Sequence, residues 1–159
     1  MLRRRDTDIT QVFKTCQYYN VDGKINPDAR LINNIGDFDD MANAILFNAL
    51  AWAITRSTAY SNRVVTYIST WFLDPETKMN PNLNYAQMSG GPDGQIGTHT
   101  GILDLKSMAK VASGVVIMRD GNADGWNSTL DANLQSWVKE YIQWITTNMI
   151  ALQEKASAK

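Results

Sequence analysis

A long polar segment near the middle of the chain carries the side chains best suited to chemistry. They are Asn80, Asn82, Tyr85, Gln87 and His99, which is the one histidine of the sequence. The amides both donate and accept hydrogen bonds, and the tyrosine adds a hydroxyl group and a flat ring that can stack on a sugar. The histidine can bind a substrate or carry a proton. Together these groups suit a neutral or weakly acidic polyhydroxylated ligand, whereas a phosphate calls for arginines or backbone N–H groups.

The polar segment is longer than an ordinary loop. Pro75 and Pro81 stop the preceding helix from continuing, and residues 89–94 are rich in glycine. A connection of about thirty residues in a compact domain is usually functional or disordered, and the mixed composition favours function. Two other interpretations stay open, because the asparagines can satisfy turn backbone and His99 can be a hydrogen-bonded structural imidazole.

Composition excludes several classes of protein. The 159 residues suffice for one domain with a core. The 15 Lys and Arg against 16 Asp and Glu leave no basic surface for nucleic acid. No apolar run approaches the roughly 18 residues that a membrane span needs. Cys16 and His99 each stand alone, so we expect no internal disulfide, no zinc site and no cofactor.

Four helices are strongly patterned, and they alternate in character. Residues 41–54 and 105–118 are apolar on most sides, which indicates inner helices surrounded by protein. Residues 59–72 and 128–145 carry apolar side chains on one face, which indicates outer helices. No segment shows the sustained alternation of a strand. The sequence therefore predicts an all-α protein, and the inner–outer order predicts a partial (α/α) toroid built of helical hairpins.

Polar residues mark where these helices are expected to begin. Asp37 suits the N-cap of the first inner helix, and Asp104 suits the cap or the first turn of the second. Ser128 and Asp131 resemble a capping box at the start of the last helix.

The chain is expected to consist of two parts. Residues 1–20 form an N-terminal segment with a less strongly patterned helix near residues 10–18, and residues 21–159 form the arc of the toroid. An arc of two hairpins leaves apolar inner faces uncovered, which is a liability for a free-standing protein. We therefore expect that neighbouring repeats are missing, or that another chain covers these faces.

The polar segment also resembles part of a known family. Residues 79–87 read Met-Asn-Pro-Asn-Leu-Asn-Tyr-Ala-Gln, and after a glycine-rich link residues 101–105 read Gly-Ile-Leu-Asp-Leu. These motifs are similar to the alginate lyase domain family, and most similar to its secreted fungal members. The similarity covers residues 20–155 and includes residues 22–30, 37–52 and 71–74.

The resemblance implies an (α/α) toroid that cleaves a uronic-acid polysaccharide, such as alginate or glucuronan, by β-elimination. Hydrogen-bond donors neutralise the sugar carboxylate, a His or Tyr removes the C5 proton, and a Tyr protonates the leaving oxygen. On this sequence it makes Asn82, Tyr85 and Gln87 substrate contacts, with Asn80 and His99 as further contacts. It implies an acidic polysaccharide as partner, no metal, and an extracellular location, although no signal peptide is visible.

One departure from the family concerns the end of the sequence. In the family, an Asn-Asn-His-Gly motif follows the part that aligns with residues 152–159, and an Arg and a Tyr come later. This sequence ends at Lys159. We therefore expect a chain truncated before the main catalytic residues, which keeps the substrate-binding half of the cleft, and no catalytic residue is named.

Two alternatives to the lyase stay open. An inverting glycoside hydrolase on the same toroid would use Asp93 or Asp104 as acid or base, with two carboxylates about 6.5–9.5 Å apart. A non-catalytic carbohydrate-binding module would bind sugar through Tyr85 and Gln87 without turnover. The products would distinguish the lyase from the two alternatives. A lyase gives products with unsaturated ends, a hydrolase gives products with saturated ends, and a binding module gives no product.

Overall fold

The computed structural model of the protein describes residues 34–88 and 97–157. Within these residues every regular element is a helix. The prediction of an all-α protein is therefore confirmed. Five α-helices are described, together with one π-helix and one 3₁₀-helix.

Several sequence-based expectations fall outside the described residues. These are the N-terminal segment 1–20, its helix near residues 10–18, Cys16, and Asp93. The boundary between an N-terminal segment and a toroid arc, and the toroid itself, stay predictions.

The chain divides into two compact units. The larger, which we call the helical unit, comprises residues 34–82 and 105–147. The described part of the other, which we call the smaller unit, comprises residues 83–88, 97–104 and 148–157.

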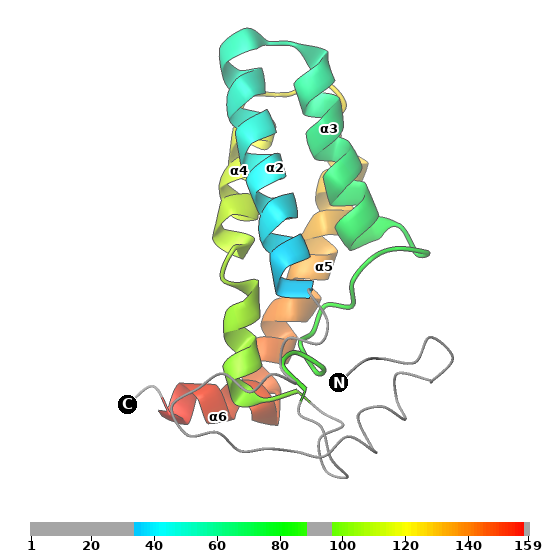
Figure 1. Ribbon diagram of the computed structural model, residues 1–159. Helices are drawn as coiled ribbons and strands as arrows, with labels where there is room; N and C mark the ends of the chain where they lie inside the picture. The colour runs from blue at the N-terminus through cyan, green and yellow to red at the C-terminus, as the bar shows by residue number, and fades with distance from the viewer. Residues whose placement is uncertain (1–33, 89–96, 158–159) are drawn as a thin grey trace, which may run out of the picture. The chain divides into compact units, whose positions relative to one another are not determined.

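Four α-helices build the helical unit: α2 (Asn34–Thr55), α3 (Thr58–Ile68), α4 (Met108–Asp120) and α5 (Ser128–Thr147). Helix α2 packs against both α3 and α4 and lies between them in Figure 1. Helix α3 continues into a π-helix, η2 (Ser69–Leu73), which packs against α5. Helices α3 and α4 therefore pack on α2, and α5 packs on the π-helix η2.

The two helices expected on the outside bury one face each. In α3, Val64 and Ile68 are fully buried, whereas Arg63 is exposed. In α5, Leu134 and Trp137 are buried. The 3.6-residue period of apolar positions placed these faces correctly, because apolar side chains that recur at this spacing lie on one side of a helix.

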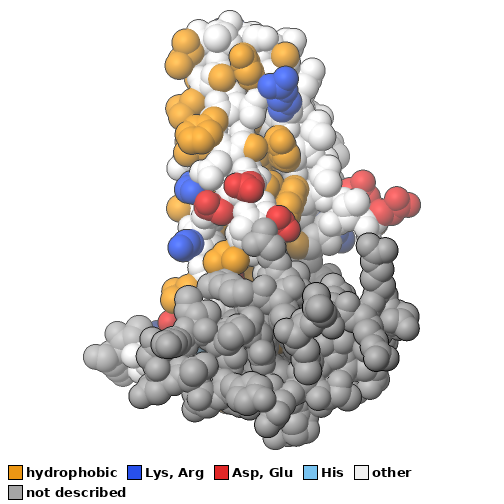
Figure 2. Space-filling view, viewed as in Figure 1, with side chains coloured by type: hydrophobic (Ala, Val, Ile, Leu, Met, Phe, Trp, Pro, Cys, Tyr) orange, Lys and Arg blue, Asp and Glu red, His pale blue; other side chains and the backbone are white. Residues whose placement is uncertain are grey.

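The helices expected on the inside are apolar on most sides, but the described chain covers only part of them. On α2, Ile45 is fully buried, whereas Phe47 is 64%, Leu50 43% and Ile54 84% exposed. On α4, Val116 is 50% exposed. Figure 2 shows hydrophobic side chains at the surface along the helices of this unit. These two helices are therefore only partly covered in this chain, as expected for an arc of two hairpins. That protein surrounds them in a complete toroid stays a prediction.

Two predicted helix starts are wrong. The described helix α2 begins at Asn34, so Asp37 lies in its first turn and is not its cap. Helix α4 begins at Met108, with Ser107 at its N-cap position, because the residues before it form the 3₁₀-helix η3 (His99–Leu105). Asp104 lies inside that 3₁₀-helix and has a different role, described below.

The capping box predicted for α5 is also wrong. The side-chain Oδ1 of Asn127 accepts a hydrogen bond from the backbone N–H of Leu130 at 2.9 Å, which makes Asn127 the cap. Asp131 instead accepts hydrogen bonds from Arg119 Nε at 2.8 Å and from Trp126 Nε1 at 3.2 Å. The cap therefore lies one residue earlier than predicted, and the acidic residue joins α5 to the preceding turn.

Aromatic rings in the helical unit fix the start of the polar segment. In η2, the backbone N–H of Asp74 reaches back five residues to Ser69 O at 2.8 Å, which is the π-helical pattern. Phe72 of this turn packs edge-on against Trp137 of α5, with ring centroids 4.8 Å apart. The indole Nε1 of Trp137 then donates to Met79 O at 3.0 Å. The residue directly before Asn80 is thus anchored to α5.

Candidate functional site

The five predicted site residues divide between the two units. Asn80 and Asn82 belong to the helical unit, where the N–H of Asn82 donates to Asn80 O at 2.7 Å. Tyr85, Gln87 and His99 belong to the smaller unit. The structure therefore groups these three in one compact body, and it is this group that we describe as the candidate site.

Two glycines hold the turn that carries Tyr85. The N–H of Gly97 donates to Asn84 O at 2.5 Å, and the N–H of Thr98 donates to Ala86 O at 3.0 Å. A Cβ added at Gly97 or at Gly101 would lie 2.6 Å or 2.5 Å from Ala86 O. Only glycine permits this approach, because a backbone oxygen cannot move aside as a flexible side chain can. The glycines near His99 thus clamp the turn against the segment that carries His99.

Gln87 holds the same two segments together through its side chain. Its Nε2 donates to Asp104 Oδ1 at 2.6 Å, and its Oε1 accepts a hydrogen bond from Thr100 Oγ1 at 3.1 Å. Gln87 also has a φ of 52°, a left-handed conformation that is uncommon for residues other than glycine. Its role as a substrate contact stays a prediction, but its amide is already engaged in the folded chain.

Asp104 is the acceptor in this network, and it is only 6% exposed. A buried carboxylate needs hydrogen-bond donors, and the Gln87 amide supplies one. This placement does not suit the acid or base of a glycoside hydrolase, since such a group must reach the glycosidic oxygen or a water molecule. Of the two carboxylates considered for that alternative, this is the one that the structure describes.

The side chain of Tyr85 is open to solvent. It is 67% exposed, whereas its neighbours Leu83 and Ala86 are buried. The turn therefore has fixed backbone on either side of an aromatic ring that is open to solvent. A ring held in this way can meet a flat sugar face at little cost in conformational entropy, because the backbone that carries it is already ordered.

His99 pairs with an acidic residue from the end of the chain. Its Nδ1 lies 2.6 Å from Oε2 of Glu154, and the two side chains are 43% and 21% exposed. Glu154 lies on α6 (Met149–Ser157), where the Oδ1 of Asn148 accepts the N–H of Ile150 at 2.9 Å. This pair joins two segments of the smaller unit, η3 and α6.

Sequence reasoning did not find Glu154. The residue is 55 positions away from His99, and it belongs to no motif among the residues that resemble the family. The signal that was available is chemical, since a lone histidine at a glycine-rich turn usually needs a hydrogen-bond partner. That signal does not say which of the 16 acidic residues is the partner.

A second polar cluster joins α2 and α4 inside the helical unit. Lys110 Nζ donates to Asp39 Oδ1 and to Asn43 Oδ1, both at 2.8 Å, and the Ser107 hydroxyl also donates to Asp39. The hydrogen bond from Lys110, followed by that from Ser107, holds the pKa of the Asp39 carboxyl below its usual value. Every member of this cluster is bonded within the cluster, so we assign it to structure and not to substrate.

The kind of site also depends on metal-binding clusters and on membrane-spanning helices. In residues 34–88 and 97–157, no three His, Cys, Asp or Glu side chains come together in a way that could hold a metal ion. None of the helices described there is both long enough and apolar enough to pass through a membrane.

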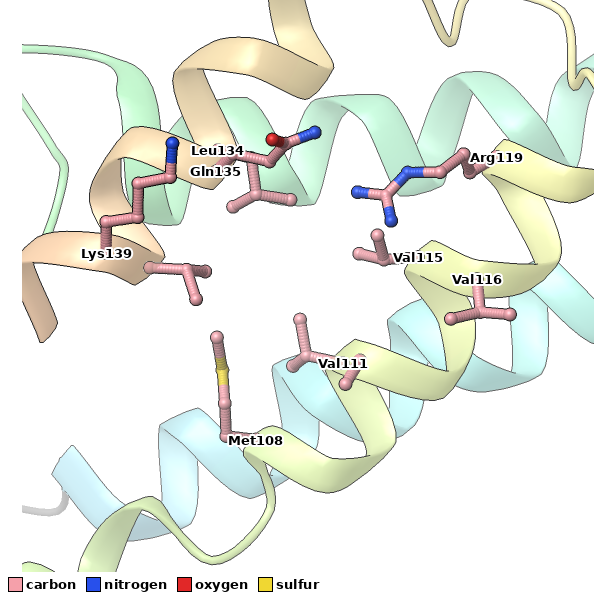
Figure 3. Close-up of a pocket in the computed structure, with 10 residues that line it drawn as sticks. Met108, Val111, Val115, Val116, Arg119, Leu134, Gln135 and Lys139 are labelled. Atoms are coloured by element: carbon pink, nitrogen blue, oxygen red, sulfur yellow. The ribbon is translucent and has the colours of Figure 1, made fainter. Parts of the chain in front are cut away.

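A groove of about 400 Å³ lies between α4 and α5 (Figure 3). Met108 and Val111 of α4 face Leu134 of α5 across it, and the charged side chains of Arg119 and Lys139 stand at its two ends. Its floor is apolar and offers a hydroxylated, acidic sugar chain few hydrogen-bond partners. The groove is therefore a less suitable sugar site than the clamped turn of the smaller unit.

Comparison with known proteins gives the class of this all-α chain. A solved structure of an alginate lyase from Bacteroides ovatus superposes with a TM-score of 0.77 at 26% sequence identity. The match covers 87% of this chain but 36% of the Bacteroides chain, so this chain spans about a third of that enzyme's length. A search of curated proteins found no match.

The family model of the alginate lyases matches residues 2–159, which is nearly the whole sequence. The chain belongs to the alginate lyase family. The resemblance inferred from the motif at residues 79–87 is therefore confirmed at the level of the family.

Proposed function

We propose that this chain is part of a polysaccharide lyase that acts on a uronic-acid polysaccharide, such as alginate or glucuronan, by β-elimination. Within it, we assign the substrate contact to Tyr85 and His99 of the smaller unit, with Gln87 of the same unit as a further contact. The contacts predicted at Asn80 and Asn82, which belong to the helical unit, are proposed separately. The observation that carries this assignment is the exposed ring of Tyr85 on a turn clamped by Gly97 and Gly101.

The chemistry of the ligand fits the side chains on this unit. A uronate residue carries ring hydroxyls and a carboxylate, and its flat face is apolar. The ring of Tyr85 can stack on that face, while its hydroxyl and the imidazole of His99 can exchange hydrogen bonds with the hydroxyls. A compact set of such contacts favours a sugar chain over a phosphate, for which no arginine cluster is provided in the smaller unit's described residues.

The elimination itself makes further demands. The carboxylate must be neutralised by donors aimed at the developing enolate, a base must take the C5 proton, and an acid must protonate the leaving oxygen. Because this chain spans 36% of the Bacteroides enzyme, we propose that it supplies substrate-binding surface and that residues outside this sequence complete the reaction centre. No described residue is assigned a catalytic role.

Lyase chemistry is tested on the product of the complete gene that contains this sequence. Incubation with alginate and, separately, with polyglucuronate should give unsaturated ends that absorb in the ultraviolet. Saturated reducing ends would identify the hydrolase instead. Binding of the polysaccharide with no product from either substrate would identify a carbohydrate-binding module.

We also propose an extracellular location, which the resemblance to secreted fungal members supports. Acidic polysaccharides of this kind lie outside the cell, so an enzyme that degrades them must meet them there. Detection of the protein in the culture medium, and not in washed cells, would support this; retention inside intact cells would contradict it.

A further inference from the structure

The pairing of His99 with Glu154 has a consequence for how the histidine meets a ligand. A carboxylate only accepts hydrogen bonds, so at 2.6 Å the shared hydrogen belongs to the Nδ1 side of the imidazole. In a neutral ring only one nitrogen carries hydrogen, and a partner at one nitrogen decides the state of the other. Nε2 is then left with a lone pair.

We propose that Glu154 is a positioning residue: it keeps His99 as the Nδ1–H tautomer and turns Nε2 toward the substrate as an acceptor. The ligand group that fits this nitrogen is a sugar hydroxyl of the uronate chain, because a hydroxyl can donate and a carboxylate cannot. This inference rests on the proposed function for the identity of the ligand, but not for the state of the ring.

The surroundings of the pair restrict its geometry. On one side, His99 begins η3, whose glycine Gly101 is in contact with the backbone of Ala86. On the other side, α6 buries Ala151, three residues before Glu154, and the Ser157 hydroxyl donates to Glu154 O at 2.9 Å. Both partners are thus carried by backbone that has its own contacts, so their hydrogen bond orients the ring on an already ordered frame.

The second ring nitrogen is the one available to a ligand. Among the residues that the structure describes, the hydrogen bond of the imidazole is the one made by Nδ1. The side chain of His99 is 43% exposed, whereas that of Glu154 is 21% exposed. The carboxylate therefore lies on the more protected side of the pair, and the imidazole on the side that solvent and a ligand can reach.

The state of the ring can be measured without ligand, because His99 is the one histidine of the chain. In a ¹⁵N-labelled sample, long-range proton–nitrogen correlations report which ring nitrogen carries hydrogen. In its neutral form, the ring should be the Nδ1–H tautomer. Glu154→Gln should keep it, since the amide oxygen also accepts, and Glu154→Ala should shift it to Nε2–H, the form that an unpaired histidine prefers.

Two results would overturn the positioning role. One is an Nε2–H tautomer in the unsubstituted protein, and the other is an unchanged tautomer in Glu154→Ala. Glu140→Ala, an exposed acidic residue of α5, is the matched control and should leave the spectrum of His99 unchanged. Circular dichroism and thermal melting of each variant show that the protein remains folded.

Binding separates this inference from the proposed function. Titration with alginate or polyglucuronate oligosaccharides should show that Glu154→Ala binds about fivefold more weakly, the value of one modest hydrogen bond, and that Glu154→Gln restores affinity. If the unsubstituted chain binds no uronan, the proposed function is wrong. The tautomer measured without ligand still tests whether Glu154 positions His99. If it binds and Glu154→Ala binds equally well, the positioning role fails and the proposed function stands.

Discussion

Tyr85 and Gln87 are two positions apart in the same turn, yet their polar groups serve different ends. The ring of Tyr85 is open to solvent, whereas the amide of Gln87 bonds Asp104 and Thr100. The sequence showed that both are polar residues in a loop, and the family motif marked both as substrate contacts. The sequence could not show that the two side chains have different roles, because the partners of Gln87 lie 13 and 17 residues further along the chain.

The Gln87 network can be tested by removing its amide. Gln87→Leu deletes a donor to the buried Asp104 carboxylate, and we expect a loss of about 1–3 kcal/mol in the free energy of unfolding. Urea denaturation measures it. Thr100→Val is the control, because Thr100 is exposed and its substitution leaves the Gln87–Asp104 bond intact. Equal stability of Gln87→Leu and the unsubstituted protein would contradict this account.

The Asp39–Lys110 pair predicts a dependence of stability on pH. Because its hydrogen bonds lower the pKa of Asp39 in the folded chain, the stabilisation is complete above the ordinary carboxyl pKa of the unfolded chain. It is lost as the pH falls through the lowered folded value. In Lys110→Met, the melting temperature should therefore fall less steeply between about pH 5 and pH 2 than in the unsubstituted protein. Identical slopes would contradict the role given to Lys110.

At the scale of elements, the buried faces of the helices could be predicted from the sequence, whereas the residues at which the helices begin could not. The buried faces of α3 and α5 follow from residue spacing alone. The start of α4 could not be predicted in this way. The pattern suggested the first turn of an α-helix, but the residues before α4 form a 3₁₀-helix next to the close contact of Gly97 and Gly101 with Ala86. The π-helix η2 could not be predicted either, because one extra residue in a helical turn does not change the composition of the segment.

The packing of α2 on α4 depends on a small residue. A Cβ at Gly114 would lie 2.7 Å from Cγ2 of Ile45. Ile45 is fully buried and cannot move far, so Gly114→Ala should cost about 1–3 kcal/mol despite the better helix propensity of alanine. Chemical denaturation measures this. Ser113→Ala, one residue earlier and exposed, should change stability by less than about 0.5 kcal/mol. If Gly114→Ala is as stable as Ser113→Ala, the prediction is wrong, because α2 and α4 then shift to accommodate the added methyl group.

For the molecule as a whole, the helical unit exposes apolar side chains that a free-standing domain would cover. Helix α2 carries Phe47, Leu50 and Ile54 at the surface, and the groove between α4 and α5 has an apolar floor. The sequence predicted uncovered inner faces from the alternation of helices. What it could not predict is the division into two units, because contacts between distant segments decide which residues form a compact body.

These exposed side chains should make the chain associate with itself. The double variant Phe47→Lys, Ile54→Lys replaces two large apolar groups with charges at positions that are 64% and 84% exposed. Its folding stability should change little, because most of the surface of the removed groups is exposed to solvent. Light scattering should show fewer oligomers than in the unsubstituted protein at equal concentration. The control Asn62→Lys adds a charge at an exposed polar position of α3 and should leave association unchanged.

Binding of a uronan by this chain through Tyr85 tests the central claim most directly. Isothermal titration with alginate and polyglucuronate oligosaccharides should show saturable binding, and Tyr85→Ala should weaken it about fivefold or more while the melting temperature is unchanged. Tyr67→Ala, a partly exposed tyrosine of α3, should bind as the unsubstituted protein does. If the folded chain binds neither oligosaccharide, or if Tyr85→Ala binds both as tightly as Tyr67→Ala does, the smaller unit is not the substrate-binding surface.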